Sequence, residues 1–384
     1  MSTDRHRVPA VEGVLTAVDL ARTADSIAAM QEPSGAIPWT PGQHVDVWNH
    51  IEAAMALLTC GRVAEAERAH AWVRRTQRHD GSWPMKVAGG QVEDASGETN
   101  MSAYPAVGVW HHWLLRRDLA FVEQMWPVVR RGLDFVTGMQ LPFGGIAWSQ
   151  EWDVAPDGTR LPAKVNEEAL LAGSSSIYQS LRAGVALADL MDDPQPGWEL
   201  AGGRLGHALR EHRDLFLDKA TFSMDWYYPI LGGAVRGRAG IDLVAERWDR
   251  FVVPGLGIKC VDTNNWVTGA ETCELVMALD ALDDHQRAVR LFADMQHLRD
   301  LSGAYWTGYV YPDDVNGQGS DSVGAFWPQE HTTYTAAAVI LAADELSRTT
   351  PGSGIMRGDT LGAHFSELAL ECGCESVTTS PSSR

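Results

Sequence analysis

The chain has 384 residues, of which 45% are hydrophobic and 21% charged, a balance typical of a globular protein that excludes global disorder. Its 31 basic and 50 acidic residues give a formal net charge of −19. Nucleic acids and anionic membranes both bind clustered Lys and Arg, so this charge argues against either partner. It leaves open a peripheral membrane contact through an apolar patch.

Other compositional features indicate a cytoplasmic protein. The five cysteines form no disulfide framework, and the N-terminus lacks the apolar stretch of a signal peptide. No segment approaches the roughly 18 apolar residues of a membrane-spanning helix. The 15 tryptophans exceed the usual share several-fold, and we expect them to line a packed ring or a ligand cleft. The sequence does not indicate an oligomeric state.

Apolar residues recur with a period near 3.6 along most of the chain, which predicts helices and leaves few strand signals. Short turns such as Cys60-Gly61 follow every second helix, and long loops rich in Gly, Trp and Asp follow the others. The predicted helices lie near residues 14–31, 45–59, 61–77, 99–115, 118–140, 166–192, 197–217, 224–233, 239–252, 266–282, 284–297 and 328–347.

These helices form six hairpins, which predict an all-α (α/α)6 toroid over residues 1–348 with amphipathic outer helices and apolar inner helices. We expect one core and no sheet of more than three strands. An open α-solenoid is the alternative arrangement. Residues 349–384 are rich in Gly, Ser, Thr and Pro, and we expect them to form a flexible C-terminal tail.

A short pattern recurs at the ends of several predicted helices: a Gln is followed within about ten residues by a Gly and a Trp. Gly ends a helix cheaply in the left-handed conformation, and we expect the Trp to pack back on the turn. The copies are Gln31–Gly35–Trp39, Gln77–Gly81–Trp83 and Gln140–Gly144–Trp148, with a looser copy at Gln296–Gly303–Trp306.

The segments from Arg68 to Trp83 and from Arg131 to Gln140 resemble the QW motif of squalene–hopene and other triterpene cyclases. The resemblance implies the α/α toroid that terpenoid cyclases share with protein prenyltransferases. The same architecture also carries glycosidases of the six-hairpin type. Because the QW repeat ties outer helices to loops, it indicates the fold rather than the chemistry.

The chain departs from the cyclases in its acidic motifs. It lacks the Asp-x-Asp-Asp motif that protonates an alkene and the Asp-Asp-x-x-Asp motif that binds a diphosphate through magnesium. The zinc ligands of a prenyltransferase are matched only loosely by Cys260, Asp262 and His331, with Asp and Cys in reversed order. We therefore expect neither a metal nor a cofactor.

In a toroid the long loops gather at one end, around the N-termini of the inner helices, and this end is the expected pocket. Every long loop supplies an aromatic residue and a carboxylate, and this mixture suits sugars, whose apolar faces stack on Trp and whose hydroxyls need Asp, Glu or Asn. The predicted substrate-binding residues are Trp39, Asp46, Trp83, Glu98, Asn100, Tyr104, Trp148, Trp152, Asp153, Trp226, Tyr227, Asp262, Asn265, Trp266, Trp306, Trp327 and His331.

The predicted function is the hydrolysis of a glycan or glycoconjugate with inversion, by two carboxyl groups about 6.5–9.5 Å apart. The predicted catalytic residues are Glu330 as general base and Glu151 as general acid, with Glu271 as a third candidate. Glu330 also suits a purely structural role as an acid at a helix N-terminus. Two other functions remain open: a terpene cyclase or prenyltransferase-like enzyme that uses the aromatics for cation–π contacts, and a non-catalytic toroid that binds a ligand.

Overall fold

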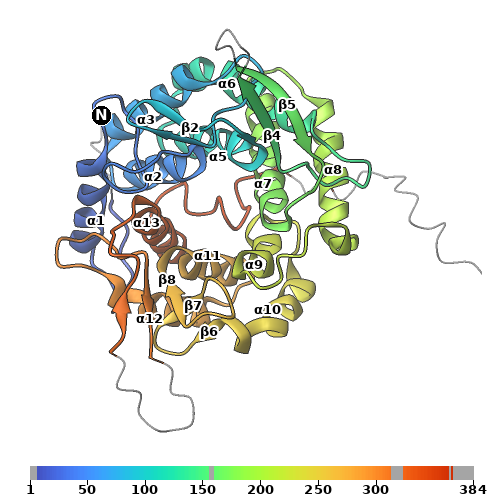
Figure 1. Ribbon diagram of the computed structural model, residues 1–384. Coiled ribbons are helices and arrows are strands. Elements are labelled where there is room, and N and C mark those ends of the chain that lie inside the picture. Colours follow the sequence, from blue (N-terminus) through green and yellow to red (C-terminus); the bar gives the residue numbers. More distant parts are fainter. Residues whose placement is uncertain (1–6, 155–159, 313–322, 363–364, 366–384) are drawn as a thin grey trace, which may run out of the picture.

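The computed structural model describes residues 7–154, 160–312, 323–362 and 365. Two concentric rings of helices make up the molecule (Figure 1). The outer ring contains α1 (Ala17–Met30), α3 (Val63–Thr76), α6 (Leu119–Thr137), α8 (Pro196–Glu211), α10 (Gly237–Phe251) and α12 (His285–Asp294). The inner ring contains α2 (Val47–Thr59), α4 (Thr99–Ala103) with α5 (Pro105–Arg116), α7 (Leu171–Leu190), α9 (Ser223–Leu231), α11 (Gly269–Asp280) and α13 (Thr333–Ser347).

The inner ring is closed. Each inner helix packs against the inner helices before and after it, and the last of them, α13, packs against both α11 and α2. Each outer helix packs against an inner partner, with α1 beside α13. An open solenoid would leave its first and last helices apart, so the structure has the (α/α)6 toroid arrangement. None of the helices in the described part of the chain is long and apolar enough to span a membrane.

The sequence explains which helices lie inside. Helix α13 is buried along almost its whole length, and its own residues are mostly small and apolar, which lets α1, α2 and α11 pack closely around it. Helix α3 buries one face, which includes Ala69 and Val73, and turns its Arg and Glu side chains outward. The helix predicted near 99–115 divides at Tyr104 into α4 and α5, since Pro105 has no N–H to continue the backbone ladder. Two short 3₁₀ helices, Arg213–Leu215 and Met295–Leu298, complete the helical part.

The expectation of an all-α domain is wrong in its detail, because the long loops pair into antiparallel sheets. One contains β1 (Lys86–Ala88) and β2 (Gln91–Asp94), and a second contains β3 (Gly97–Glu98), β4 (Ser149–Val154) and β5 (Arg160–Asn166). The third has five strands in the order β10 (Ala325–Phe326), β9 (Gly308–Val310), β8 (Trp266–Thr268), β7 (Gly257–Lys259) and β6 (Val252–Val253).

This five-stranded sheet exceeds the three-strand limit that we expected. Its strands are two or three residues long, so they carry no periodic signal in the sequence. They form because loops from successive hairpins lie side by side at one end of the toroid and satisfy each other's backbone groups. For example, Val267 of β8 pairs with Tyr309 of β9.

The recurring Gln forms a glutamine latch between neighbouring hairpins. In the copy at Gln77, the side-chain Nε2 donates to the Gly81 carbonyl in its own turn at 3.0 Å and to the Val128 carbonyl of α6 at 2.9 Å. Gln31 makes the same pair of bonds to Gly35 and Glu65, and Gln140 makes it to Gly144 and Ala201. The latch therefore ties α1 to α3, α3 to α6, and α6 to α8.

The Gly of each latch lies directly against the next outer helix. Gly81 has a φ of +97°, and a Cβ at this position would lie 2.0 Å from the Arg131 carbonyl oxygen of α6. Likewise, a Cβ on Gly35 would lie 2.4 Å from the Arg68 carbonyl oxygen, and a Cβ on Gly144 would lie 2.6 Å from the Arg204 carbonyl oxygen. The looser fourth copy lacks the inter-helix amide bond, because Gln296 donates to Phe292 of its own helix, but Gly303 still packs against Arg22 of α1.

The segment after α13 is a C-terminal strap (residues 349–362) rather than the start of a flexible tail. In Figure 1 it runs across the middle of the ring. Residues 352–356 are buried, and Ile355 and Met356 belong to the single hydrophobic core. Polar contacts, which a hydrophobicity pattern does not reveal, hold the strap: Gln179 of α7 donates to the Ile355 carbonyl, and Met356 donates its N–H to Glu345 of α13. Residues 366–384 of the predicted tail lie outside the described residues.

We expect Gly81→Ala to destabilise the fold more than Gly42→Ala. Both glycines have a positive φ, so both substitutions carry the left-handed penalty of about 1–2 kcal/mol. Only Gly81 contacts a backbone carbonyl; Gly42 has nothing within 4 Å of the added carbon. Urea unfolding measures the difference, and equal free energies of unfolding for the two variants would show that the close approach does not matter.

We expect Arg357→Gln to cost about 3–5 kcal/mol of stability. The Arg357 guanidinium pairs with the buried carboxylates of Asp280 at 3.2 Å and Glu345 at 2.6 Å. Burial already raises the pKa of Glu345 well above its usual range, and removal of the arginine leaves that carboxyl without its main counter-charge. The exposed pair Arg238–Asp242 is the control, and Arg238→Gln should change stability by about 0.5 kcal/mol or less in the same denaturation experiment.

Candidate active site

The N-terminal ends of the inner helices form the rim of the toroid, at the end opposite the C-terminal strap. Acidic residues recur there because carboxylates cap helix N-termini. Asp46 caps α2 by accepting the Asn49 N–H at 2.9 Å, and Glu98 caps α4 by accepting the Met101 N–H at 2.5 Å. Glu271 lies in the first turn of α11. The capping geometry thus brings carboxyl groups from several helices to one end of the ring.

Glu98 is the rim carboxyl with the most unusual electrostatics. It is buried, and β3 holds its backbone against Ser149 of β4. Burial, with a smaller contribution from the neighbouring carboxyl of Asp46, raises the pKa of Glu98 to about 7. The absence of a side chain at Gly173 leaves space beside its Oε1, which lies 3.9 Å from the position of a Cβ there. A carboxyl that is partly protonated near neutral pH suits a general acid.

Asp46 and Asn49 form a fixed pair beside Glu98. The Asn49 Nδ2 donates to Asp46 Oδ2 at 2.6 Å, and the imidazole of His44 lies 3.8 Å from the same oxygen. Burial raises the pKa of Asp46, while the Asn49 hydrogen bonds oppose the rise. Two neighbouring carboxyl groups disfavour each other's negative charge. Asp46 and Glu98 therefore bind a proton more readily than two isolated carboxyl groups would.

Glu330 lies just before α13 and is half-buried. Its Oε1 accepts the Trp39 Nε1–H at 2.9 Å and the Thr307 hydroxyl at 3.3 Å. The Trp39 ring packs on Tyr334 of α13, with centroids 5.6 Å apart. His331, the next residue along the chain, packs on Trp306 at 4.0 Å. One carboxylate oxygen is therefore oriented by two donors from different hairpins, as a positioned catalytic carboxylate requires.

A polar floor lies one turn below the rim. Glu274 of α11 accepts hydroxyls from Tyr227 and Tyr228 of α9 and from Tyr334 of α13, the last two at 2.7 and 2.8 Å. On the other side, Glu52 of α2 accepts the Tyr104 hydroxyl at 2.9 Å.

These floor carboxyls have displaced acidities and were not predicted. Burial and the nearby Glu271 raise the pKa of Glu274 to about 8, and burial raises that of Glu52 well above its usual range. Each is a glutamate inside a mostly apolar inner helix, flanked by hydrophobic residues. That pattern was the signal in the sequence, because buried glutamates are rare unless partnered.

The structure distributes the predicted catalytic residues unevenly. Glu330 and Glu271 are half-buried at the ends of adjacent inner helices α13 and α11. Glu151 is exposed on β4, in the hairpin with β5. Its neighbour Trp152 has Arg78 over its ring at 4.2 Å, and Asp153 is exposed. Glu151 thus stands on a loop hairpin rather than on an inner helix.

The predicted binding residues fall into four groups, and Trp83 with Trp226 make up the fourth. The first belongs to the loops and helix starts of the rim side and keeps some exposure or a capping position: Trp39, Asp46, Glu98, Asn100, Trp148, Trp152, Asp153, Asn265, Trp266, Trp306, Trp327 and His331. Tyr104 and Tyr227 are floor residues that are buried and bonded to glutamates. Asp262 pairs with Arg250 of the outer helix α10.

Trp83 and Trp226 are corrections, because neither is placed to contact a substrate. Trp83 is 2% exposed and donates its Nε1–H to the Val73 carbonyl of α3. Trp226 is fully buried, donates to the Leu243 carbonyl of α10 and stacks on Phe251. The Trp83 ring lies against the outer helices α3 and α6, and the Trp226 ring lies between α9 and α10. The sequence marked them as loop aromatics, but the direction of a side chain from its loop depends on the neighbouring helix.

We expect Glu98 to make the protein less stable as the pH rises from about 5 to 8. The folded pKa of about 7 exceeds the unfolded value of 4.5, so between them the folded state binds more protons. The stabilisation is fully present below pH 4.5 and is lost as the pH rises through 7. Glu98→Gln imitates the protonated carboxyl. When the free energy of unfolding is measured at several pH values, the variant should lack the decrease of about 3 kcal/mol that Glu98 causes as the pH rises. The exposed Glu93→Gln is the control, and an unchanged dependence in Glu98→Gln would contradict the assignment.

Comparisons with known proteins bear on the fold and on the activity. No family model matches the chain. The MMP endo-(1,4)-3-O-methyl-alpha-D-mannosidase of Mycolicibacterium hassiacum is 53% identical over 371 residues, which cover 97% of this chain and 98% of that protein.

Solved structures with the same fold are more distant in sequence. A wild-type glycosidase aligns with a TM-score of 0.62 at 16% identity, covering 86% of this chain and 97% of that one. The GH63 mannosylglycerate hydrolase of Thermus thermophilus aligns with a TM-score of 0.58 at 14% identity, covering 84% and 99%. A D-mannose isomerase aligns with a TM-score of 0.58 at 11% identity, covering 87% and 98%. At such identities these structures show the fold alone.

These relatives support the six-hairpin glycosidase architecture and give no support to a terpenoid cyclase. The QW-like repeat therefore carried information about helix packing and not about an isoprenoid substrate. The prediction of a glycan-hydrolysing enzyme is confirmed by the relationship over nearly the full length. The chain belongs to the family of the MMP endo-(1,4)-3-O-methyl-α-D-mannosidase and is a glycoside hydrolase.

Proposed function

We propose that the protein cleaves internal (1→4) bonds between 3-O-methyl-α-D-mannose units of a methylmannose polysaccharide. The observation that carries this proposal is the 53% identity to the mycobacterial endo-mannosidase over 97% of the chain. The rim supports it independently, since it combines tryptophans with carboxyl and amide groups. A 3-O-methylated sugar is more apolar than a free one, and its ring faces and methyl groups match exposed aromatics such as Trp327, which is 53% exposed and packs edge-on against Trp266.

We assign Glu98 as the general acid and Glu330 as the general base of an inverting reaction. Glu98 gives its proton to the glycosidic oxygen as the bond from that oxygen to the anomeric carbon breaks. A water attacks the opposite face of the anomeric carbon and loses a proton to Glu330. Proton exchange with solvent then restores both groups. The raised pKa of Glu98 and the oriented Oε1 of Glu330 are the observations behind these two roles.

Glu271 and Glu151 are assigned lesser roles. Glu271 lies on α11, three places around the inner ring from α5, and so across the lumen from Glu98. It is the alternative base. Glu151 is exposed on the β4–β5 hairpin, where it would contact sugar units away from the cleaved bond. Its replacement should therefore change KM more than kcat.

The test uses methylmannose polysaccharide with the Gln variants of these glutamates. We expect Glu98→Gln and Glu330→Gln to lower kcat about 10²–10⁴-fold while substrate still binds, since each removes one proton transfer. Glu93→Gln, an exposed glutamate on β2, is the matched control and should retain wild-type kcat. Mass spectrometry should show internal fragments, and early NMR spectra should show the β anomer at the new reducing end.

Three outcomes would contradict parts of the proposal. Release of single terminal sugars would show an exo-acting enzyme. An α anomer formed first would show retention of configuration. Loss of turnover in Glu271→Gln together with normal turnover in Glu330→Gln would move the base to α11.

A further inference from the structure

Two arginine side chains converge near the strap end of the toroid, far from the rim. Arg182 of α7 is 4% exposed, and its Nη2 donates to the Gly362 carbonyl of the strap at 3.0 Å. Its Nε and Nη1 are buried without any hydrogen-bond partner. An isolated buried charge with free donors is costly, so such a group normally has a counter-ion or an acidic partner.

Arg236 approaches the same place from the start of α10. Its Nη2 donates to the Met356 carbonyl of the strap at 3.1 Å. A carbon placed on Gly233 would lie 3.0 Å from Arg182 Nη1 and 3.4 Å from Arg236 Nη2, so both nitrogens border one point. Burial, together with the charge of Arg182, lowers the pKa of Arg236 to about 10. The two guanidinium groups therefore repel each other in a poorly solvated position.

Two acidic residues, Glu345 and Asp359, favour the charge of Arg236 without pairing with it in the described part of the chain. Among the residues that the structure describes, neither Arg182 nor Arg236 takes part in an ion pair. The nearby Glu345 and Asp359 are engaged by Arg357 at 2.6 and 2.7 Å. A chain with 50 acidic residues has no shortage of partners, so the unbalanced positive charge is a local feature.

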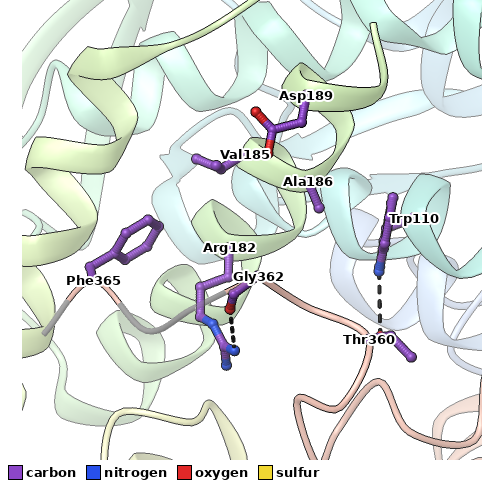
Figure 2. Close-up of a pocket in the computed structure, with 8 residues that line it drawn as sticks. All are labelled: Trp110, Arg182, Val185, Ala186, Asp189, Thr360, Gly362 and Phe365. Atoms are coloured by element: carbon purple, nitrogen blue, oxygen red, sulfur yellow. Dashed lines mark hydrogen bonds between the residues drawn. The ribbon is translucent and has the colours of Figure 1, made fainter. Parts of the chain in front are cut away.

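A pocket of about 260 Å³ adjoins Arg182 (Figure 2). The strap forms one side through Thr360 and Gly362, and the ring of Trp110 on α5 stands opposite α7. Asp189 also lines the pocket, but it lies at the edge away from the guanidinium. Arg182 is the cationic residue among those that line this pocket, so an anion that enters it would bind at the Arg182 end.

We propose that a small oxyanion, a phosphate or carboxylate group, binds between Arg182 and Arg236 and joins α7, α10 and the strap. The planar guanidinium of Arg182 presents Nε and Nη1, and Arg236 presents Nη2, which suits oxygens of one tetrahedral or planar anion. The buried Tyr178 hydroxyl, which has no hydrogen-bond partner, is a further donor beside both arginines. The site is independent of the hydrolytic rim.

The test measures thermal unfolding of the full-length protein in phosphate, sulfate, acetate or chloride at equal ionic strength. Phosphate or acetate should raise the midpoint by about 2 °C or more over chloride, and calorimetric titration with phosphate should show one site. Sulfate reports whether any tetrahedral oxyanion suffices. Arg236→Gln should abolish the shift in the midpoint. It is the first choice because Arg236 is half-buried, so its replacement disturbs folding less than Arg182→Met. The exposed Arg238→Gln is the control and should retain the shift.

Equal midpoints in all four anions would overturn the proposal, because the backbone carbonyls of the strap would then suffice for the two arginines. A phosphate effect that survives in both Arg236→Gln and Arg182→Met would also overturn it, by placing the anion elsewhere. A phosphate shift that is seen only in a chain ending at Phe365 would also overturn the proposal of a small free oxyanion. In that case carboxylates of residues 366–384 would be what pairs with Arg182 and Arg236 in the full-length protein.

Discussion

The glutamine latch is the interaction on which the double ring depends. The amide of Gln77 donates one hydrogen to the Gly81 carbonyl in the turn that follows α3 and the other to the Val128 carbonyl in the middle of the next outer helix, α6. Because the same bonds recur at Gln31 and Gln140, successive hairpins meet at the same relative position. A repeated step of this kind closes into a ring.

Where the ring closes, the amide bond to the next helix is missing and other contacts replace it. Gly303 lies against the backbone of Arg22 on α1, and Arg299 pairs with Asp19 at 3.1 Å. Within the inner ring, the Glu274 carboxylate joins α11 to α9 and α13 through tyrosine hydroxyls. Buried polar groups that are fully bonded in this way favour one arrangement of the helices over others.

The two ends of the toroid differ because only one of them is covered by the chain. The strap crosses the C-terminal ends of the inner helices, and Arg357 neutralises Asp280 and Glu345 there. At the other end the helix N-termini attract carboxylates, and the caps of α2 and α4 are also site residues. The preference of acids for helix starts thus accounts for the carboxyl groups of the hydrolytic end, whereas the arginines of the other end come from the middle of α7, the start of α10 and the strap.

The sequence by itself determined the hairpins, the ring and the end of the ring that carries the acidic and aromatic residues, because helical periodicity and the Gln–Gly–Trp repeat are local signals. It did not determine which way a loop side chain points. Trp39 and Trp83 both follow the Gly of the repeat, by four and two residues, yet Trp39 donates to Glu330 while Trp83 donates to a carbonyl of its own hairpin.

Only the tertiary structure decided the small sheets, the strap and the acidities of Glu98 and Glu274. Each of these arises from groups that are distant in the sequence: loop backbones that pair, carbonyls that the strap covers, and neighbours that exclude water from a carboxyl. Burial and partner identity are properties of the assembled ring, so a residue type and its spacing do not contain them.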